Sequence, residues 1–148
     1  MPPAESAEVI VLDASVAVRW VVTEAGSDEA AALLDREVVW LAPRLLLTEA
    51  ASALRRKAVA GAFEAAMAVQ ALDVLLQGVT DGVIRLVDDE ALASQALILA
   101  LTLEHKVPDC VSLALAEREG AAIATADGRL ARLAGSRGVT VHRVPIRK

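Results

Sequence analysis

Short apolar runs alternate with longer segments of helical periodicity along this chain. The apolar runs are bounded by acids, proline or glycine and predict buried strands at 8–13, 38–43, 83–89, 121–128 and 139–144. The intervening segments predict helices at 14–22, 27–37, 44–61, 62–78, 90–106, 108–120 and 129–135. Strands that alternate with helices favour an α/β fold, with a mostly parallel sheet of about five strands flanked by helices on both faces.

Local signals set the expected boundaries of several helices. Ser27 is the expected N-cap of the helix over 27–37, and glycines at 61 and 78 are expected to end the next two helices. The apolar stretch "ALASQALILALTL" is too short to span a bilayer and predicts a buried helix. No linker or internal repeat interrupts the pattern, so we expect a single domain over 1–148 with a short N-terminal extension at 1–7.

The composition argues against some kinds of nucleic-acid binding. Apolar residues make up 55% of the chain, but the only aromatic residues are Trp20, Trp40 and Phe63, which argues against an aromatic platform for stacking bases. We assign both tryptophans to core or dimer contacts. A net charge of −5 argues against broad, non-specific nucleic-acid binding, although it allows a small basic rim.

The expected location is the cytoplasm. Cys110 is the only cysteine and is expected to be a small buried thiol, which suits a reducing compartment. The first residues, "MPPAESAE", do not resemble a signal peptide, and we expect no association with a membrane.

Four acids stand where an α/β sheet would bring ligands together. Asp13 ends the first strand, Asp127 follows the fourth, Asp109 begins a helix after a proline, and Glu49 lies on the helix after the second strand. Each aspartate also has an ordinary explanation as a turn or helix-capping residue. Glu49 could lie on a solvated helix face, but no Lys or Arg stands three or four positions away to pair with it.

If these acids do converge, their mutual repulsion would call for a cation. Hard divalent cations with oxygen ligands, Mg²⁺ or Mn²⁺, suit such a group and stabilise charge on a reacting phosphate. The two histidines are too far apart in the chain for a zinc pattern, and no phosphate-binding glycine loop or serine-hydrolase elbow is present.

Three segments together resemble the PIN-domain ribonucleases, and more narrowly the VapC-type toxins of VapBC toxin–antitoxin pairs. They read "VIVLDASVAVRWVV", "APRLLLTEAASALRR" and "VPDCVSLALAEREGAAIATADGRLARL". The resemblance implies that the four acids are catalytic and hold the metal, some of them through water. It also implies that Ser15 and Thr125 orient these carboxylates by hydrogen bonds without touching the metal themselves. Local backbone hydrogen bonds are the alternative role for both hydroxyls.

The resemblance further implies metal-dependent hydrolysis of structured RNA such as tRNA or rRNA, by a homodimer inhibited by a cognate VapB-like antitoxin. Two alternatives remain, a PIN nuclease of RNA processing outside toxin–antitoxin systems and a non-catalytic PIN interaction domain. Arg19, Arg55 and Arg56 could contact RNA phosphate, although solvated or helix-end positions are favoured for them. His105 is expected at the surface or at a helix end.

Overall fold

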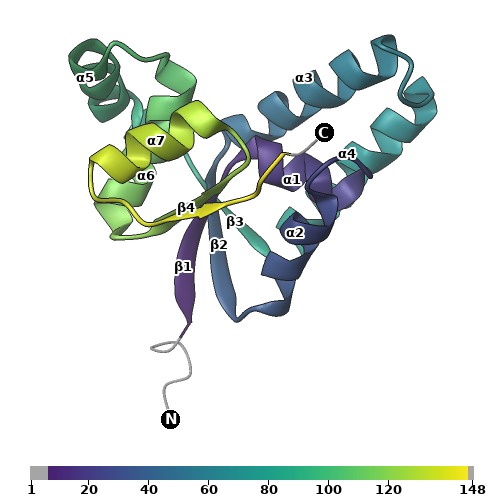
Figure 1. The fold of residues 1–148 in the computed structure, drawn as a ribbon, viewed down its shortest axis with the longest axis horizontal. Helices are drawn as coiled ribbons and strands as arrows, with labels where there is room; N and C mark the ends of the chain where they lie inside the picture. Colours follow the sequence, from purple (N-terminus) through teal and green to yellow (C-terminus); the bar gives the residue numbers. More distant parts are fainter. Residues whose placement is uncertain (1–6, 147–148) are drawn as a thin grey trace.

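The computed structural model describes residues 7–146, and its centre is a parallel sheet of five strands in the order β3-β2-β1-β4-β5 (Figure 1). The strands are β1 (Glu8–Leu12), β2 (Val38–Pro43), β3 (Ile84–Val87), β4 (Ala122–Thr125) and β5 (Val141–Arg143). The helices are α1 (Ala14–Val21), α2 (Ser27–Ala32), α3 (Leu45–Val59), α4 (Ala65–Thr80), α5 (Ala93–Leu103), α6 (Val107–Glu119) and α7 (Gly128–Ser136). Short 3-10 turns, η2 (Leu33–Asp35) and η3 (Asp89–Ala91), follow α2 and β3. The predicted fold class is confirmed, whereas most of the predicted extension at 1–7 lies outside the described residues.

Alternating side chains on the central strands divide the core into two halves. Ile10 and Leu12 of β1 pack with α1 to α4, whereas Val11 between them packs with α5 to α7. The same alternation holds on β4, where Ala124 faces the first group and Ile123 the second. The sheet is therefore covered on both faces, as the apolar strands predicted, and Figure 1 places α5, α6 and α7 together on one side of it.

The strand order creates a switch point at the carboxyl edge of the sheet. The chain builds β2 and β3 on one side of β1, then crosses over and builds β4 and β5 on the other side. Ile10 pairs with Trp40 on β2 and with Ala122 on β4. Ligands of open α/β sheets collect in the crevice outside the strands at such a point, which here lies between the ends of β1 and β4.

The boundaries of α2 and α4 differ from the sequence predictions. Gly26, with a φ of 90°, occupies the N-cap of α2, and Ser27 is the first helical residue instead of the cap. The Ser27 hydroxyl instead accepts a hydrogen bond from the Glu24 amide and donates one to the Val22 carbonyl. Helix α4 continues through Gly78 to Thr80, and the amide of Val83 closes its end on the Gly78 carbonyl.

Helix α5 is also not buried in the way its sequence suggested. Ala96, Leu99 and Ala100 face the core, but Leu97, Ile98 and Leu101 are 52%, 56% and 72% exposed. Composition alone cannot distinguish a helix buried all round from one with an uncovered apolar face. Within residues 7–146, no helix is both long enough and apolar enough to cross a membrane.

The other core predictions hold. Trp20 and Trp40 pack edge to face with ring centroids 5.0 Å apart, and the Trp20 indole donates to the Ala30 carbonyl at 2.8 Å. Cys110 is a free, fully buried thiol in the half of the core beneath α6. Neither tryptophan is placed to stack on a nucleic-acid base.

Candidate active site at the carboxyl edge of the sheet

Asp13 marks the centre of the site, where β1 ends and α1 begins. It is the N-cap of α1, since its side chain accepts a hydrogen bond from the Ser15 amide at 3.4 Å. Its own amide bonds to the Ala124 carbonyl of β4, so it lies at the switch point between the two strands. The predicted capping role is therefore present, and it places the carboxylate at the ligand-binding edge at the same time.

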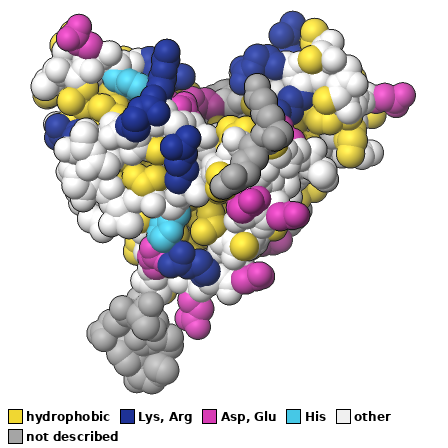
Figure 2. Space-filling model, viewed as in Figure 1, with side chains coloured by type: hydrophobic (Ala, Val, Ile, Leu, Met, Phe, Trp, Pro, Cys, Tyr) yellow, Lys and Arg dark blue, Asp and Glu magenta, His cyan; other side chains and the backbone are white. Residues whose placement is uncertain are grey.

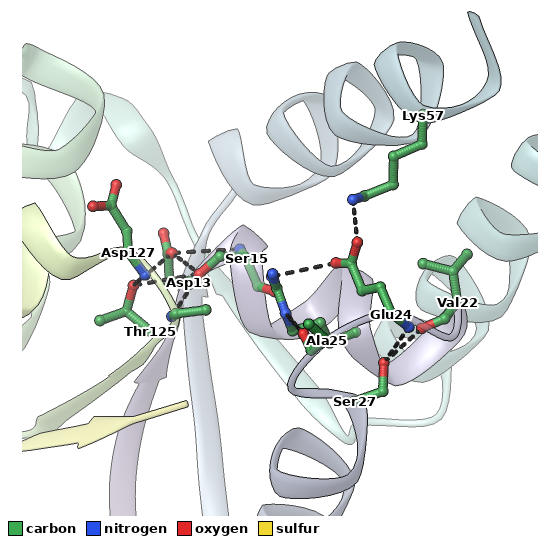
Figure 3. A network of polar contacts seen from close by, with 11 residues as sticks. Asp13, Ser15, Val22, Glu24, Ala25, Ser27, Lys57, Thr125 and Asp127 are labelled. Carbon is green, nitrogen blue, oxygen red and sulfur yellow. Dashed lines mark hydrogen bonds and ion pairs between the residues drawn. The ribbon is translucent and has the colours of Figure 1, made fainter. Parts of the chain in front are cut away.

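Two hydroxyls hold the Asp13 carboxylate by the same oxygen (Figure 3). The hydroxyls of Ser15 and Thr125 both donate to Asp13 Oδ2, Thr125 at 2.9 Å. Backbone amides fix the donors in turn, because Ala126 N–H donates to Ser15 Oγ at 2.9 Å and Asp127 N–H donates to Thr125 Oγ1 at 3.0 Å. The hydrogen bonds that the Asp13 side chain accepts all engage Oδ2, so Asp13 Oδ1 makes no hydrogen bond among the described residues. Sequence reasoning suggested this orienting arrangement through resemblance only, and the geometry now gives it a physical basis.

Glu49 and Asp109 bring further negative charge beside Asp13. Burial raises the pKa of Asp13 above its ordinary value, against the effect of the two hydroxyl bonds, and the charge of Asp109 also raises it. Burial and the charges of Asp13 and Asp109 raise the pKa of Glu49 to about 7, despite the opposing charge of Lys106. Both pKa shifts come first from burial, which disfavours the charged form, and the neighbouring carboxylates add to them.

Asp109 has a partner that sequence reasoning missed. The Asp109 side chain is only 7% exposed, and its Oδ2 lies 2.7 Å from Nε2 of His105 and 3.8 Å from Nζ of Lys106. His105 lies between the end of α5 and the start of α6, as the expected helix-end position allowed, but it is only 15% exposed and contacts a residue of the candidate site. The spacing of four positions between His105 and Asp109, next to a helix start, is the signal that could have found the pair.

Asp127 combines a capping role with a place in the site. Its Oδ1 accepts from the amides of Arg129 at 2.8 Å and Leu130 at 3.4 Å, so it begins α7. It also lines the same cavity as Asp13, Glu49 and Asp109. The structure thus brings all four predicted acids to one cavity of 710 Å³.

The other end of this cavity is basic. Arg19, Arg56 and Lys57 line it, and Glu24 lies among them, whereas Arg55 is not part of the lining. Glu24 forms ion pairs with Arg19 at 3.3 Å and with Lys57, so one buried acid holds two cations in place. Figure 3 shows Lys57 reaching down from its helix to Glu24. Sequence reasoning did not select Glu24.

Arg19 is held more firmly than a solvated side chain. It donates to the carbonyls of Ser15 and Ala25, each at 2.7 Å, besides pairing with Glu24. These contacts connect α1 to the turn that follows it, so Arg19 has a structural role in the wall of the cavity. In Figure 2 the top of the molecule is hollowed. Acidic side chains are visible in this hollow, and basic side chains stand on both sides of it.

The donor set suits a hard divalent cation. Asp13 and Glu49 offer carboxylate oxygens whose pKa values are raised first by burial and then by neighbouring acids. Carboxylate oxygens are the ligands that Mg²⁺ and Mn²⁺ prefer, and a cation would offset the charge of the neighbouring acids. Over residues 7–146, no group of three His, Cys, Asp or Glu side chains already stands at metal-binding distances. Metal binding by several of these acids would therefore require their side chains to rearrange from the described positions.

Comparison with known proteins places the fold in a family. The model of the PIN domain matches residues 10–136, and the chain belongs to the PIN domain family. The predicted resemblance to PIN domains is thereby confirmed. A search of curated proteins found no match.

Several solved structures share the fold. PAE2754 from Pyrobaculum aerophilum is 23% identical, with 91% of each chain covered and a TM-score of 0.65. VapC20 from Mycobacterium tuberculosis, a toxin that cleaves the sarcin–ricin loop, is 20% identical, with 84% of this chain and 94% of that chain covered and a TM-score of 0.66. VapBC2 from Rickettsia felis, bound to a promoter DNA fragment, is 14% identical, with coverages of 91% and 98% and a TM-score of 0.63. At these identities the likeness establishes the fold alone.

Proposed function

We propose that this protein is a metal-dependent endoribonuclease and the toxin of a type II toxin–antitoxin pair. The observation that carries the proposal is the convergence of Asp13, Glu49, Asp109 and Asp127 on one cavity at the switch point of the sheet. PIN domains are generally hydrolytic ribonucleases, so membership of the family supports the reaction class. The toxin role rests on the shared fold with VapC20 and VapBC2.

The proposed cofactor is Mg²⁺ or Mn²⁺, held by the four acids. When bound, such a cation supplies Lewis-acid stabilisation of phosphate charge and lowers the pKa of water. The chain's own contribution is orientation. Ser15 and Thr125 fix Asp13 through Oδ2, and Asp127 is fixed as the cap of α7. Residues held in this way need little rearrangement when the substrate arrives.

The proposed substrate is structured RNA, such as tRNA or rRNA, recognised through its backbone. Trp40 is buried and Trp20 packs against it, which leaves little aromatic surface for base stacking, whereas cations stand at one end of the cavity. The proposed inhibitor is a VapB-like antitoxin whose basic segment would neutralise the acidic end of the cavity.

The proposed assembly is a homodimer of single PIN domains spanning 1–148, located in the cytoplasm. The exposed apolar face of α5, formed by Leu97, Ile98 and Leu101, is consistent with a covered interface. In the proposed dimer, a second copy of the chain covers this face of α5.

The test is to sequence RNA 5′ ends after brief induction of the parent protein or Asp13→Asn in growing cells. New 5′ ends at a few positions in tRNA or rRNA, together with growth arrest, are expected for the parent alone. Rescue of growth by a small protein encoded beside the toxin would support the antitoxin pairing. The same cuts from Asp13→Asn would refute the site.

Two other results would redirect the assignment. Cuts confined to precursor RNA without growth arrest would favour an RNA-processing nuclease. Tight Mn²⁺ binding by calorimetry, without cleavage of any cellular RNA, would favour a non-catalytic interaction domain.

A further inference from the structure

Arginines without an acidic partner gather around the candidate site. Among residues 7–146, most Lys and Arg side chains lie within ion-pair distance of a carboxylate. The cations that have no such pair are Arg55, Arg56, Arg85, Arg129, Arg132 and Arg143. Arg55 and Arg56 belong to α3, which lines the cavity, whereas Arg129, Arg132 and Arg143 belong to α7 and β5, which contact each other next to Asp127 of the cavity lining. Unbalanced positive charge therefore accumulates at this edge of an otherwise acidic chain.

Two of these arginines converge on one point beside the site. A Cβ atom added at Gly128 would lie 2.9 Å from Nη2 of Arg143 and 3.3 Å from Nη1 of Arg132. The two guanidinium groups therefore meet over the first residue of α7, although they come from different elements. The absence of a side chain at Gly128 leaves room for Arg143 to lie against the backbone.

The nearby acid, Asp127, forms no ion pair with either arginine in the described part of the chain. Asp127 is the residue immediately before Gly128, but its Oδ1 is engaged by the amides of Arg129 and Leu130. Neither Arg132 nor Arg143 forms an ion pair or a side-chain hydrogen bond within the described part of the chain. Two adjacent guanidinium groups repel each other, and an anion between them would remove that repulsion.

We propose that Arg132 and Arg143 form a phosphate-binding site for the RNA backbone, beside the bond cleaved at the carboxylate cluster. This inference rests on the proposed function. A guanidinium fork matches two phosphate oxygens, which makes arginine suited to this task. The carboxylates in the cavity repel the phosphates of an RNA strand. Positive charges beside these carboxylates are therefore needed to hold the phosphates that flank the cleaved bond.

The test measures RNA binding separately from cleavage. A fluorescein-labelled single-stranded RNA is titrated with Asp13→Asn protein in Mg²⁺ at several KCl concentrations, and binding is followed by anisotropy. Adding Arg132→Ala and Arg143→Ala should weaken binding by about tenfold or more, the equivalent of one charged hydrogen bond. It should also lower the slope of log affinity against log salt by about 1.4, because two contacts to single-stranded RNA are lost.

Arg85→Ala is the matched control. Arg85 is exposed, has no ion pair in the described chain, and lies on β3 at the far edge of the sheet. Its replacement removes one positive charge, as each of the two substitutions at the site does, and should leave both affinity and slope nearly unchanged. The lysine pair, Arg132→Lys with Arg143→Lys, should keep the slope while losing part of the affinity, because the charge remains and the fork is lost.

Equal binding by the double alanine variant and Arg85→Ala would overturn the proposal. Normal RNA binding with loss of affinity only for the antitoxin would also overturn it, and would assign the pair to a protein interface. If the parent protein cuts no RNA but binding still depends on the two arginines, the nuclease proposal fails while the phosphate site stands.

Discussion

The first strand of the sheet carries a carboxylate at each end, and the two have opposite surroundings. Glu8, at the start of β1, pairs with Arg36 and with Nε2 of His142. Asp13, after the end of β1, is held by two neutral hydroxyls and lies near another acid, Asp109. One carboxylate is paired with a cation at the protein surface, whereas the other is half-buried, has no cationic partner among the described residues and has a raised pKa.

The same contrast extends to the two edges of the sheet. Near the amino edge, Glu117 accepts a hydrogen bond from Arg137 at 2.6 Å, so this acid is paired as Glu8 is. The carboxyl edge also holds ion pairs, such as that of Arg44 with Asp88, but there the charges of Asp13 and Asp109 raise the pKa of Glu49, and Arg132 meets Arg143. Like charges brought together in this way cost stability unless a ligand balances them, and they are typical of functional sites.

The largest expected effect comes from removing the charge of Asp13. Asp13→Asn should lower the rate of Mg²⁺-dependent RNA cleavage by more than about 100-fold, beyond the effect typical of an outer partner of a metal ligand. Glu8→Gln, at the other end of the same strand, should stay within about twofold of the parent. Circular dichroism checks that both variants fold. Comparable losses in the two variants would abolish the contrast between the ends of β1.

The next effect concerns the hydroxyl that orients Asp13. Thr125→Val keeps the shape of this fully buried residue but removes the bond to Asp13 Oδ2 and the acceptor for the Asp127 amide. Cleavage should fall by about 10- to 100-fold, and Thr125→Ser should restore most of it. Thr80→Val, which loses only a bond to its own helix, is the control. An unchanged rate in Thr125→Val would limit this hydroxyl to a structural role.

A smaller effect is expected on the stability of the metal-free protein. The pKa of Glu49 in the folded state, about 7, exceeds its ordinary value of 4.5, so the folded protein holds this proton more tightly than the unfolded chain. The free energy of unfolding should therefore decrease as the pH rises from about 4.5 to about 7 and then level off. Burial of Asp13 shifts its pKa in the same direction and adds to this decrease.

Glu49→Gln should remove part of this decrease. At pH 8 the metal-free variant should be more stable than the parent by about 1 kcal/mol, the equivalent of one pKa unit, since partial solvent exposure weakens the effect. Urea unfolding at pH 5 and pH 8 measures this, with Glu37→Gln as a control on an exposed acid. Mn²⁺ should stabilise the parent more than the variant. A variant less stable than the parent at pH 8 would contradict the assigned repulsion.

The strands and the four acids could be predicted from the sequence because they depend on local pattern and simple topology. A buried strand is a short apolar run, and parallel strands bring their carboxyl ends to one edge, which places Asp13 and Asp127 together. Glu49 could be selected because an acid without a nearby cation on its helix is unusual. These inferences required no knowledge of how side chains point.

The partners of these acids could not be predicted in the same way. Glu24 is important because Lys57, more than thirty positions later, reaches it across the cavity. Arg143 meets Arg132 only because β5 ends beside α7. The exposed residues of α5, such as Leu101, have the same apolar character as buried ones. Each of these features depends on tertiary packing, which local periodicity does not specify.

The smallest expected effect lies at the paired end of β1. Glu8→Gln removes the negative charge of the carboxylate that contacts both Arg36 and His142. All three side chains are partly exposed, so solvent already screens the attraction between Glu8 and its partners. The free energy of unfolding should fall by less than about 1 kcal/mol, and the loss should diminish at high salt. Urea unfolding at low and high KCl measures both, with Glu37→Gln as the control for removing an acid at this edge. A loss above about 2 kcal/mol would mean that the paired end of β1 also depends strongly on its charge. Charge pairing would then no longer distinguish the two ends of β1.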